Sequence, residues 1–132
     1  DLQDEGKVRH VGVSNVDLGE LATARGLVEV VSVQNRYNLT DRASEKVVEA
    51  CDEAGIAFIP WFPLATGRLA GSALERVARR KGVSPIQLGL AWLLHRSPVM
   101  LPIPGTASVA HLEENVRAAA IQLSAEEMEE LG

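Results

Sequence analysis

The sequence predicts an α/β fold of about four parallel strands with covering helices, and three observations support this prediction. Four short apolar runs occur along the 132-residue chain and are nearly continuous, which is typical of parallel strands covered on both faces. Segments with clear helix-start signals separate these runs. Strand and helix therefore alternate, as they do in right-handed βαβ units.

The first two apolar runs are rich in β-branched residues and predict strands at residues 8–13 and 28–33. The third and fourth runs, at residues 57–61 and 99–103, each contain a proline. Proline cannot donate a ladder hydrogen bond, so it restricts where these two strands can pair.

Each helix is predicted from a side-chain oxygen that can cap its first turn, in most cases with an acid or amide three residues later. Gly55 is expected to end the second helix in the left-handed conformation, and Gly82 to end the third. The predicted opening residues are Asp17 with Glu20, Thr40 or Asp41, Ser72 with Glu75, Ser84 with Gln87, Ser108, and Ser124 with Glu127.

Apolar side chains at helical spacing predict which face of two of these helices is buried. The lone Cys51 is interpreted as a small core residue of this kind. The expected inward residues are Val47, Val48, Cys51 and Ala54 in the second helix, and Leu88, Ala91, Trp92 and Leu94 in the fourth; the fifth helix bears the apolar residues Val109, Leu112 and Val116.

Four βα units amount to half of a TIM-type (βα)8 barrel, since a complete barrel takes about 250 residues. We therefore expect a single domain over residues 1–132, a fragment whose N-terminal half-barrel is absent; the lack of an initiator methionine agrees with this expectation. The alternative is a four-stranded doubly wound sheet. No strand, however, is followed by the G-x-G-x-x-G turn that favours a dinucleotide fold of that kind.

The composition argues against several classes of protein. A net charge of −5 with scattered Lys and Arg gives no basic stripe for nucleic acid. No apolar run reaches the roughly 20 residues of a membrane helix, and the start does not resemble a signal peptide, so we expect a cytoplasmic protein. The three histidines, His10, His95 and His111, lack metal-ligand spacing, and no metal site is expected.

In βα barrels the polar residues at the carboxyl ends of strands form the functional face. Ser14, Asn15 and Gln34 are uncharged donors and acceptors, suited to gripping an amide. The alternative is that Asn15 merely builds the turn before the first helix. The full set of candidates is Ser14, Asn15, Gln34, Asn35, Trp61, Phe62, Gly105 and Thr106.

The segment at residues 104–108 follows a strand and opens a helix, so several free backbone N–H groups and the positive helix end lie at one place. This arrangement could accept a phosphate. A plain capping loop has the same composition, and that alternative stays open.

Three sequence motifs together resemble those in the second half of the aldo-keto reductases. They are GKVRHVGVSN at residues 6–15, VQNRYN at residues 33–38, and LPIPGT at residues 101–106 with HLEEN at residues 111–115. The resemblance covers the whole chain. It implies a single eight-fold barrel that reduces aldehydes and ketones with NADPH, occasionally NADH, without metal or flavin.

The resemblance also implies roles for individual residues. Ser14, Asn15 and Gln34 would hold the nicotinamide carboxamide, and Trp61, where the family more often has tyrosine, would lie flat against the nicotinamide ring. The other positions that it implies are Phe62, Leu64 and Thr66 for the pyrophosphate passage, Gly105, Thr106 and Ala107 for the adenosine 2′-phosphate, and His111, Glu114 and Asn115 for the adenine end.

Two departures from the family pattern concern the 2′-phosphate. Many relatives have a lysine where Gly105 stands and an arginine where His111 stands, and both would pair with that phosphate. NADP remains the expected cofactor, but the absence of both residues weakens the case against NAD.

The family's catalytic tyrosine, lysine, aspartate and histidine come from the first four strands, so the resemblance implies no catalytic residue in this chain. The one tyrosine, Tyr37, does not stand at the catalytic position. We therefore expect the cofactor-binding portion of an NADP(H)-dependent aldo-keto reductase, inactive alone. The alternatives are a non-catalytic half-barrel that binds nucleotide or self-associates as a homodimer through open edges and an apolar interior, and a phosphate-binding barrel of unrelated chemistry.

Overall fold

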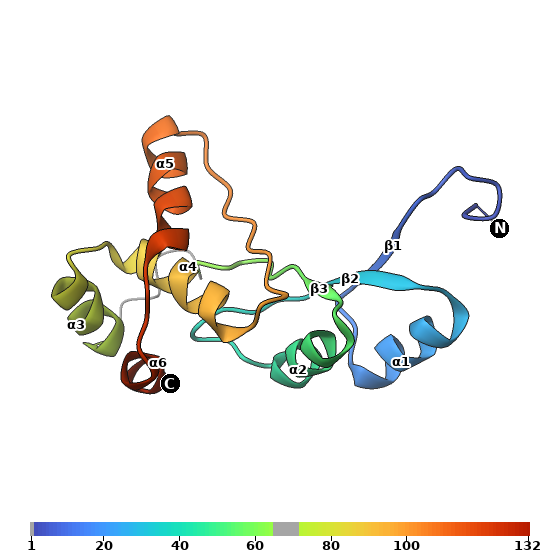
Figure 1. The fold of residues 1–132 in the computed structure, drawn as a ribbon, viewed down its shortest axis with the longest axis horizontal. Coiled ribbons are helices and arrows are strands. Elements are labelled where there is room, and N and C mark those ends of the chain that lie inside the picture. The colour runs from blue at the N-terminus through green and yellow to red at the C-terminus, as the bar shows by residue number, and fades with distance from the viewer. Residues whose placement is uncertain (1, 65–71) are drawn as a thin grey trace.

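In a computed structural model, residues 2–64 and 72–132 are described. The described sheet is parallel and three-stranded, in the order β1 (Val11–Ser14), β2 (Val30–Gln34), β3 (Ala57–Phe58) (Figure 1). Val13 lies opposite Val33, which lies opposite Phe58, so the three side chains share one face. Val33 and Phe58 are fully buried on that face, which carries the core.

The fourth apolar run pairs with β3 in the parallel direction, but through a single bridge between Phe58 and Met100 rather than a strand. The Phe58 amide donates to the Val99 carbonyl at 2.9 Å, and the Leu101 amide donates to the Phe58 carbonyl at 2.8 Å. Backbone amides alternate sides along a strand, so the next amide of β3 due on this edge is that of residue 60, and the ladder stops because Pro60 has no N–H to donate. The parallel α/β architecture is confirmed, with its fourth strand reduced to this bridge.

The first two strands begin later than predicted. The amides of Lys7 and Val8 both donate to the Leu2 carbonyl, at 2.9 and 3.1 Å, so this segment forms a turn and His10 lies outside β1. The amide of Val28 donates to the Ala24 carbonyl and so ends the preceding helix instead of starting β2. Local helix and turn hydrogen bonds thus compete successfully with the strand preference of these residues.

The helices follow the predicted order. Capping boxes form at Asp17, Ser84 and Ser124, and the Ser108 hydroxyl accepts from the His111 amide, so these four predicted helix starts are confirmed. The helices are α1 (Leu18–Leu27), α2 (Glu45–Ala54), α3 (Ser72–Lys81), α4 (Pro85–Arg96), α5 (Val109–Arg117), followed by a short 3-10 turn at Ala118–Ala120, and α6 (Ala125–Leu131).

The predicted start of α2 at Thr40 or Asp41 is wrong, because these residues belong to a separate turn. The Asn38 side-chain oxygen accepts from the Thr40 amide and from the Thr40 hydroxyl, both at 2.9 Å. The backbones of Asn38 and Asp41 also bond to each other. The helix therefore starts only at Glu45, and it ends as predicted at Gly55, whose φ of 66° is left-handed.

The inward faces of α2 and α4 are largely as predicted. Val47, Val48 and Cys51 are buried in α2, and Leu88, Ala91 and Trp92 in α4. Ala54 and Leu94 were expected inside and are exposed instead. In α4 the buried stripe is wider than predicted and includes Leu90 and Leu93.

The apolar residues of α5 are exposed. Val109, Leu112 and Val116 are 73%, 53% and 66% exposed, and no residue of this helix is buried. In Figure 1, α5 stands away from the sheet, whereas α1 and α2 lie along one side of it. The apolar stripe of α5 is therefore real, but nothing among the described residues covers it.

The open face of the sheet also differs from the expected apolar interior. The register places Gly12 opposite Ser32 and Ser14 opposite Gln34, so small and polar side chains line this face of β1 and β2. A Cβ atom added at Gly12 would come within 2.3 Å of the Ser32 hydroxyl. The Ser32 hydroxyl therefore occupies the space beside Gly12, and a side chain at position 12 would require it to move.

An aromatic cluster at the centre of the core joins the sheet to α2 and α4. The Tyr37 ring stacks on Trp92 and meets Phe58 edge-on, each with 5.8 Å between ring centroids. The Tyr37 hydroxyl donates to the Glu45 carboxylate at 2.7 Å, and Arg96 binds the same carboxylate. Burial first, and the Glu45 charge second, raise the pKa of Tyr37. Tyr37 is therefore a structural residue.

Within the two described ranges, no helix has the combination of length and apolar character that crossing a bilayer requires.

Candidate functional site

The structure brings three predicted site residues together at the carboxyl ends of β1 and β2. The Ser14 hydroxyl donates to the Gln34 carbonyl at 2.8 Å, and the Asn15 amide donates to the same carbonyl at 3.0 Å. The Asn15 side-chain nitrogen donates to the Ser14 hydroxyl oxygen at 3.2 Å. The register that pairs Ser14 with Gln34 is what makes these contacts possible.

Trp61 joins this group from the segment after β3. Its backbone amide donates to the Asn35 carbonyl at 3.0 Å, which continues the parallel pairing beyond the strand. Its indole nitrogen donates to the Asn15 side-chain oxygen at 2.9 Å. Ser14, Asn15, Gln34 and Trp61 are called the Asn15 cluster from here on.

Positive φ angles occur in the Asn15 cluster and directly after it. Asn15 and Phe62, with φ of 55° and 61°, are the non-glycine residues with positive φ in the described part of the chain. Asparagine tolerates this region, whereas an aromatic residue there is costly by roughly 1–3 kcal/mol. The buried Asn38 side chain donates to the Phe62 carbonyl at 3.1 Å and helps to hold this conformation. Such strain is typical of functional sites.

Arg36 is a residue that sequence reasoning missed. Its guanidinium carbon lies 5.8 Å from the centroid of the Trp61 ring and 5.1 Å from that of Phe62, and its Nε is 2.8 Å from the Asp41 carboxylate. It follows Gln34 closely in the sequence, but no pattern distinguishes it from a solvated surface arginine. The structure shows that it adds a positive charge beside the two aromatic rings.

The predicted phosphate loop is open to solvent. Gly105, Thr106 and Ala107 are all exposed, and a Cβ atom added at Gly105 would meet nothing within 4 Å. The Thr106 hydroxyl accepts from the Ser108 amide at 3.1 Å, and the Ser108 hydroxyl accepts from the His111 amide at 3.4 Å. The loop therefore caps α5 with its own side chains while leaving room around Gly105.

The residues predicted for the adenine end lie on α5. His111 is exposed, and Asn115 is half-buried. The Glu114 carboxylate accepts from the Ser84 hydroxyl at 2.5 Å, and its backbone carbonyl accepts from the Gln87 side chain at 3.1 Å. Glu114 thus docks α5 on the start of α4. No described hydrogen bond joins these residues to the Asn15 cluster.

Two further predicted positions follow Phe62, which is itself half-buried. Leu64 is half-buried and packs against the hydrophobic core. Thr66 lies outside the described residues. In residues 2–64 and 72–132, no three side chains of His, Cys, Asp or Glu gather in a way that could hold a metal ion.

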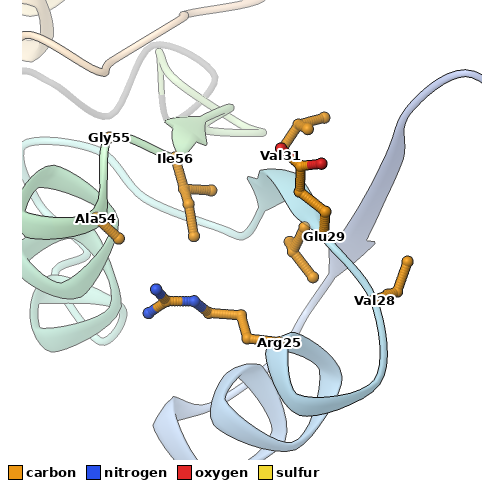
Figure 2. Close-up of a pocket in the computed structure, with 8 residues that line it drawn as sticks. Arg25, Val28, Glu29, Val31, Ala54, Gly55 and Ile56 are labelled. Atoms are coloured by element: carbon orange, nitrogen blue, oxygen red, sulfur yellow. The ribbon is translucent and has the colours of Figure 1, made fainter.

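A separate pocket of about 370 Å³ lies at the opposite, amino ends of β2 and β3. Figure 2 shows the Arg25 side chain reaching from α1 toward Ala54 and Ile56. In βα barrels this end of the strands mainly serves stability. The lining residues are Arg25, Val28, Glu29, Val30, Val31, Ala54, Gly55 and Ile56.

The chain is similar in sequence to known proteins of one family. The sequence profile of the aldo/keto reductase family matches residues 1–132. An uncharacterized oxidoreductase of Schizosaccharomyces pombe is 54% identical over 127 residues, which are 95% of this chain and 42% of that protein. The pyridoxine 4-dehydrogenase of Escherichia coli is 47% identical over 127 residues, 96% of this chain and 44% of that protein.

The fold is matched by the crystal structure of an aldo/keto reductase from Klebsiella pneumoniae in complex with NADP and acetate. The TM-score is 0.88 at 33% identity, over 98% of this chain and 49% of that one. The chain thus spans about half the length, or less, of each of these relatives.

Proposed function

Because this chain belongs to the aldo/keto reductase family, we propose that it is the cofactor-binding portion of an NADP(H)-dependent reductase that converts a carbonyl group to an alcohol by hydride transfer. The observation that carries this proposal is the Asn15 cluster, in which amide and hydroxyl groups from three chain segments converge at the carboxyl ends of the strands. The substrate class that we propose for the whole enzyme is a small aldehyde or ketone.

The cluster fits a primary carboxamide, such as that of nicotinamide. Among the described residues, the side-chain amide of Gln34 has no hydrogen-bond partner, so it can both donate and accept. Asn15 keeps a second hydrogen on its side-chain nitrogen, and the Ser14 oxygen keeps a lone pair. A ligand with one carbonyl oxygen and one NH₂ group is complementary to this set.

The remaining predicted positions receive the proposed roles that the family resemblance gives them. Phe62, Leu64 and Thr66 would line the passage for the pyrophosphate, and Arg36 adds a cation on that side. We propose the 2′-phosphate and adenine end at two groups of residues, namely Gly105, Thr106 and Ala107, and His111, Glu114 and Asn115. The NADP complex of the Klebsiella relative supports NADP as the cofactor.

When bound, NADPH supplies the hydride for the carbonyl carbon. A proton must also reach the carbonyl oxygen, and Tyr37 cannot provide it, because its buried hydroxyl donates to Glu45 and its pKa is raised. We therefore propose that this chain holds the hydride donor, that Tyr37 is not the proton donor, and that the chain is inactive alone because the catalytic residues of the family come from the other half of the barrel.

NADPH should quench the tryptophan fluorescence of the 132-residue chain, because Trp61 belongs to the proposed site. Replacing Gln34 by alanine should weaken binding about tenfold, since it removes hydrogen bonds to the carboxamide worth about 1.4 kcal/mol. The dissociation constant is read from the titration.

The matched control is Arg25→Ala, which alters the pocket at the other end of the strands and should leave NADPH affinity unchanged. Equal loss of affinity in both variants would contradict the proposed site. Measurable NADPH-dependent reduction of a simple aldehyde by this chain alone would contradict the proposal that the chain binds the cofactor but is inactive alone.

A second candidate function, self-association as a homodimer, is favoured by one observation. Exposed apolar side chains from α4, α5 and the segment between them line a groove of about 420 Å³. Burying such a patch against another copy of the chain would remove it from water. The exposed apolar residues that line this groove are Leu94, Leu101, Leu112 and Val116.

If this candidate holds, the chain should sediment as a dimer at micromolar concentration, and Leu112→Glu should make it monomeric because a carboxylate cannot be buried unpaired in an apolar contact. Leu27→Glu is the control, since Leu27 is 83% exposed on α1 and does not line the groove. A well-folded monomer of the unaltered chain at that concentration would eliminate the homodimer.

A further inference from the structure

The hydrogen bond between Trp61 and Asn15 settles which way the Asn15 amide points. An indole N–H can only donate, so the atom that faces it must be the oxygen of the Asn15 side chain. The nitrogen of that amide then has to lie on the other side, where it donates to the Ser14 hydroxyl oxygen. Trp61 therefore excludes the flipped orientation of the amide, which would place two donors against each other.

The hydrogen bonds from Asn15 to Ser14 and from Ser14 to Gln34 form a chain in which each residue donates to the next. Asn15 donates to the Ser14 oxygen, and the Ser14 hydroxyl in turn donates to the Gln34 carbonyl at 2.8 Å. A carbonyl can only accept, so the far end of the chain of bonds is also fixed. One hydrogen on the Asn15 side-chain nitrogen remains without a partner among the described residues. This arrangement leaves one N–H of the Asn15 side chain free and fixes its orientation.

The backbone of this turn is held independently of Trp61. The Asn35 side chain is buried, and its oxygen accepts from the Val16 amide at 3.0 Å while its nitrogen donates to the Val16 carbonyl at 2.7 Å. The Asn15 amide is bound to the Gln34 carbonyl. Loss of the indole N–H should therefore release the Asn15 side chain without unfolding the turn.

We propose that Trp61 is a positioning residue: its indole N–H orients the Asn15 carboxamide so that the free N–H of Asn15 faces the carbonyl oxygen of a bound nicotinamide carboxamide. This inference rests on the proposed function and adds to it a specificity determinant. Phenylalanine at position 61 would keep an aromatic ring but has no N–H, so the Asn15 amide could turn and present its oxygen instead.

The direct test is nitrogen-15 NMR of the 132-residue chain without any ligand. The chain has two tryptophans, and the indole signal that disappears in Trp61→Phe identifies Trp61. Asn15→Asp retains an oxygen acceptor, whereas Asn15→Gly removes the side chain and suits a φ of 55°. Hydrogen exchange of the Trp61 indole should stay slow in Asn15→Asp and become at least about threefold faster in Asn15→Gly.

In the same spectra, the side-chain NH₂ signals of Asn15 should be sharp in the unaltered chain and should broaden or shift in Trp61→Phe, because the amide then samples more than one orientation. The indole signal of Trp92 is the internal reference and should not change. An indole exchange rate for Trp61 that is the same in Asn15→Gly as in the unaltered chain would overturn the inference, whatever the chain does with NADPH.

A double-mutant cycle with NADPH then tests the consequence for binding. Asn15→Gly should weaken binding about three- to tenfold in the unaltered background and clearly less in the Trp61→Phe background, because there the amide is no longer oriented. Equal losses in both backgrounds would overturn the positioning role. If no form binds NADPH, the proposed function fails, and the ligand-free NMR measurements still decide whether Trp61 orients Asn15.

Discussion

Replacing Trp92 by alanine should lower the free energy of unfolding by about 3–5 kcal/mol, the largest effect expected for a single substitution in this chain. Trp92 is 1% exposed, its ring stacks on Tyr37, and the Arg42 guanidinium carbon lies 4.5 Å from its ring centroid. Alanine would leave a cavity between α4 and the segment that carries Tyr37 and Arg42, and the surrounding elements could fill it only in part.

Urea denaturation followed by circular dichroism measures this effect. Because a domain of this kind has only about 5–15 kcal/mol of stability, Trp92→Ala should be close to unfolding at room temperature. Trp92→Phe should lose less, since it retains the stacked ring, and Leu27→Ala should be near neutral because Leu27 is exposed. A loss below about 1 kcal/mol for Trp92→Ala would show that this core is packed differently.

Replacing Glu45 by alanine should cost about 2–3 kcal/mol, because it removes the acceptor of the Tyr37 hydroxyl and the partner of Arg96 together. The side chains of Arg96 and Glu45 are 25% and 28% exposed, so the loss should remain below that of a fully buried pair. Glu49→Ala is the matched control: Glu49 is 57% exposed and 3.5 Å from the same guanidinium, and its removal should cost no more than about 0.5 kcal/mol.

The same cluster predicts a loss of stability at alkaline pH. The folded-state pKa of Tyr37 is raised, so the folded chain holds this proton more tightly than the unfolded chain does. Its contribution to stability is complete below the unfolded tyrosine pKa of about 10 and is lost as the pH rises above it. Burial raises the pKa of Cys51 to about 11, which acts in the same direction.

The chain has one tyrosine, so tyrosinate absorbance reports on Tyr37 alone. In the unaltered chain it should appear only together with alkaline unfolding. Both transitions should come at lower pH in Glu45→Ala, as expected for a less stable fold, and remain unchanged in Glu49→Ala. Ionisation of Tyr37 well before unfolding would contradict the burial and hydrogen bonding described for it.

Sequence reasoning predicted the locally determined features of the fold well. The capping boxes at Asp17, Ser84 and Ser124 depend on residues three positions apart. Gly55 ends α2 because glycine adopts a left-handed φ without steric cost. The start of α2 was mispredicted because the Asn38 side chain, outside the expected helix, accepts hydrogen bonds from the Thr40 amide and hydroxyl. That competition depends on the geometry of the turn rather than on residue type.

Features that depend on distant contacts could not be predicted in the same way. The residues of the Asn15 cluster were identified in advance, but the bond from Trp61 to Asn15 requires the register of three chain segments. The exposure of the apolar stripe on α5 follows from what covers that helix, which its own periodicity does not encode. Arg36 was missed because only its position over Trp61 and Phe62 distinguishes it.

The central claim, that this chain carries a nicotinamide-cofactor site at the carboxyl ends of its strands, is tested most directly by mapping NADPH binding with NMR. Backbone and side-chain signals should shift at Ser14, Asn15, Gln34 and Trp61, and at the loop of Gly105, while those of the Arg25 pocket stay in place. Shifts confined to the Arg25 pocket, or no shifts at saturating NADPH, would contradict the claim.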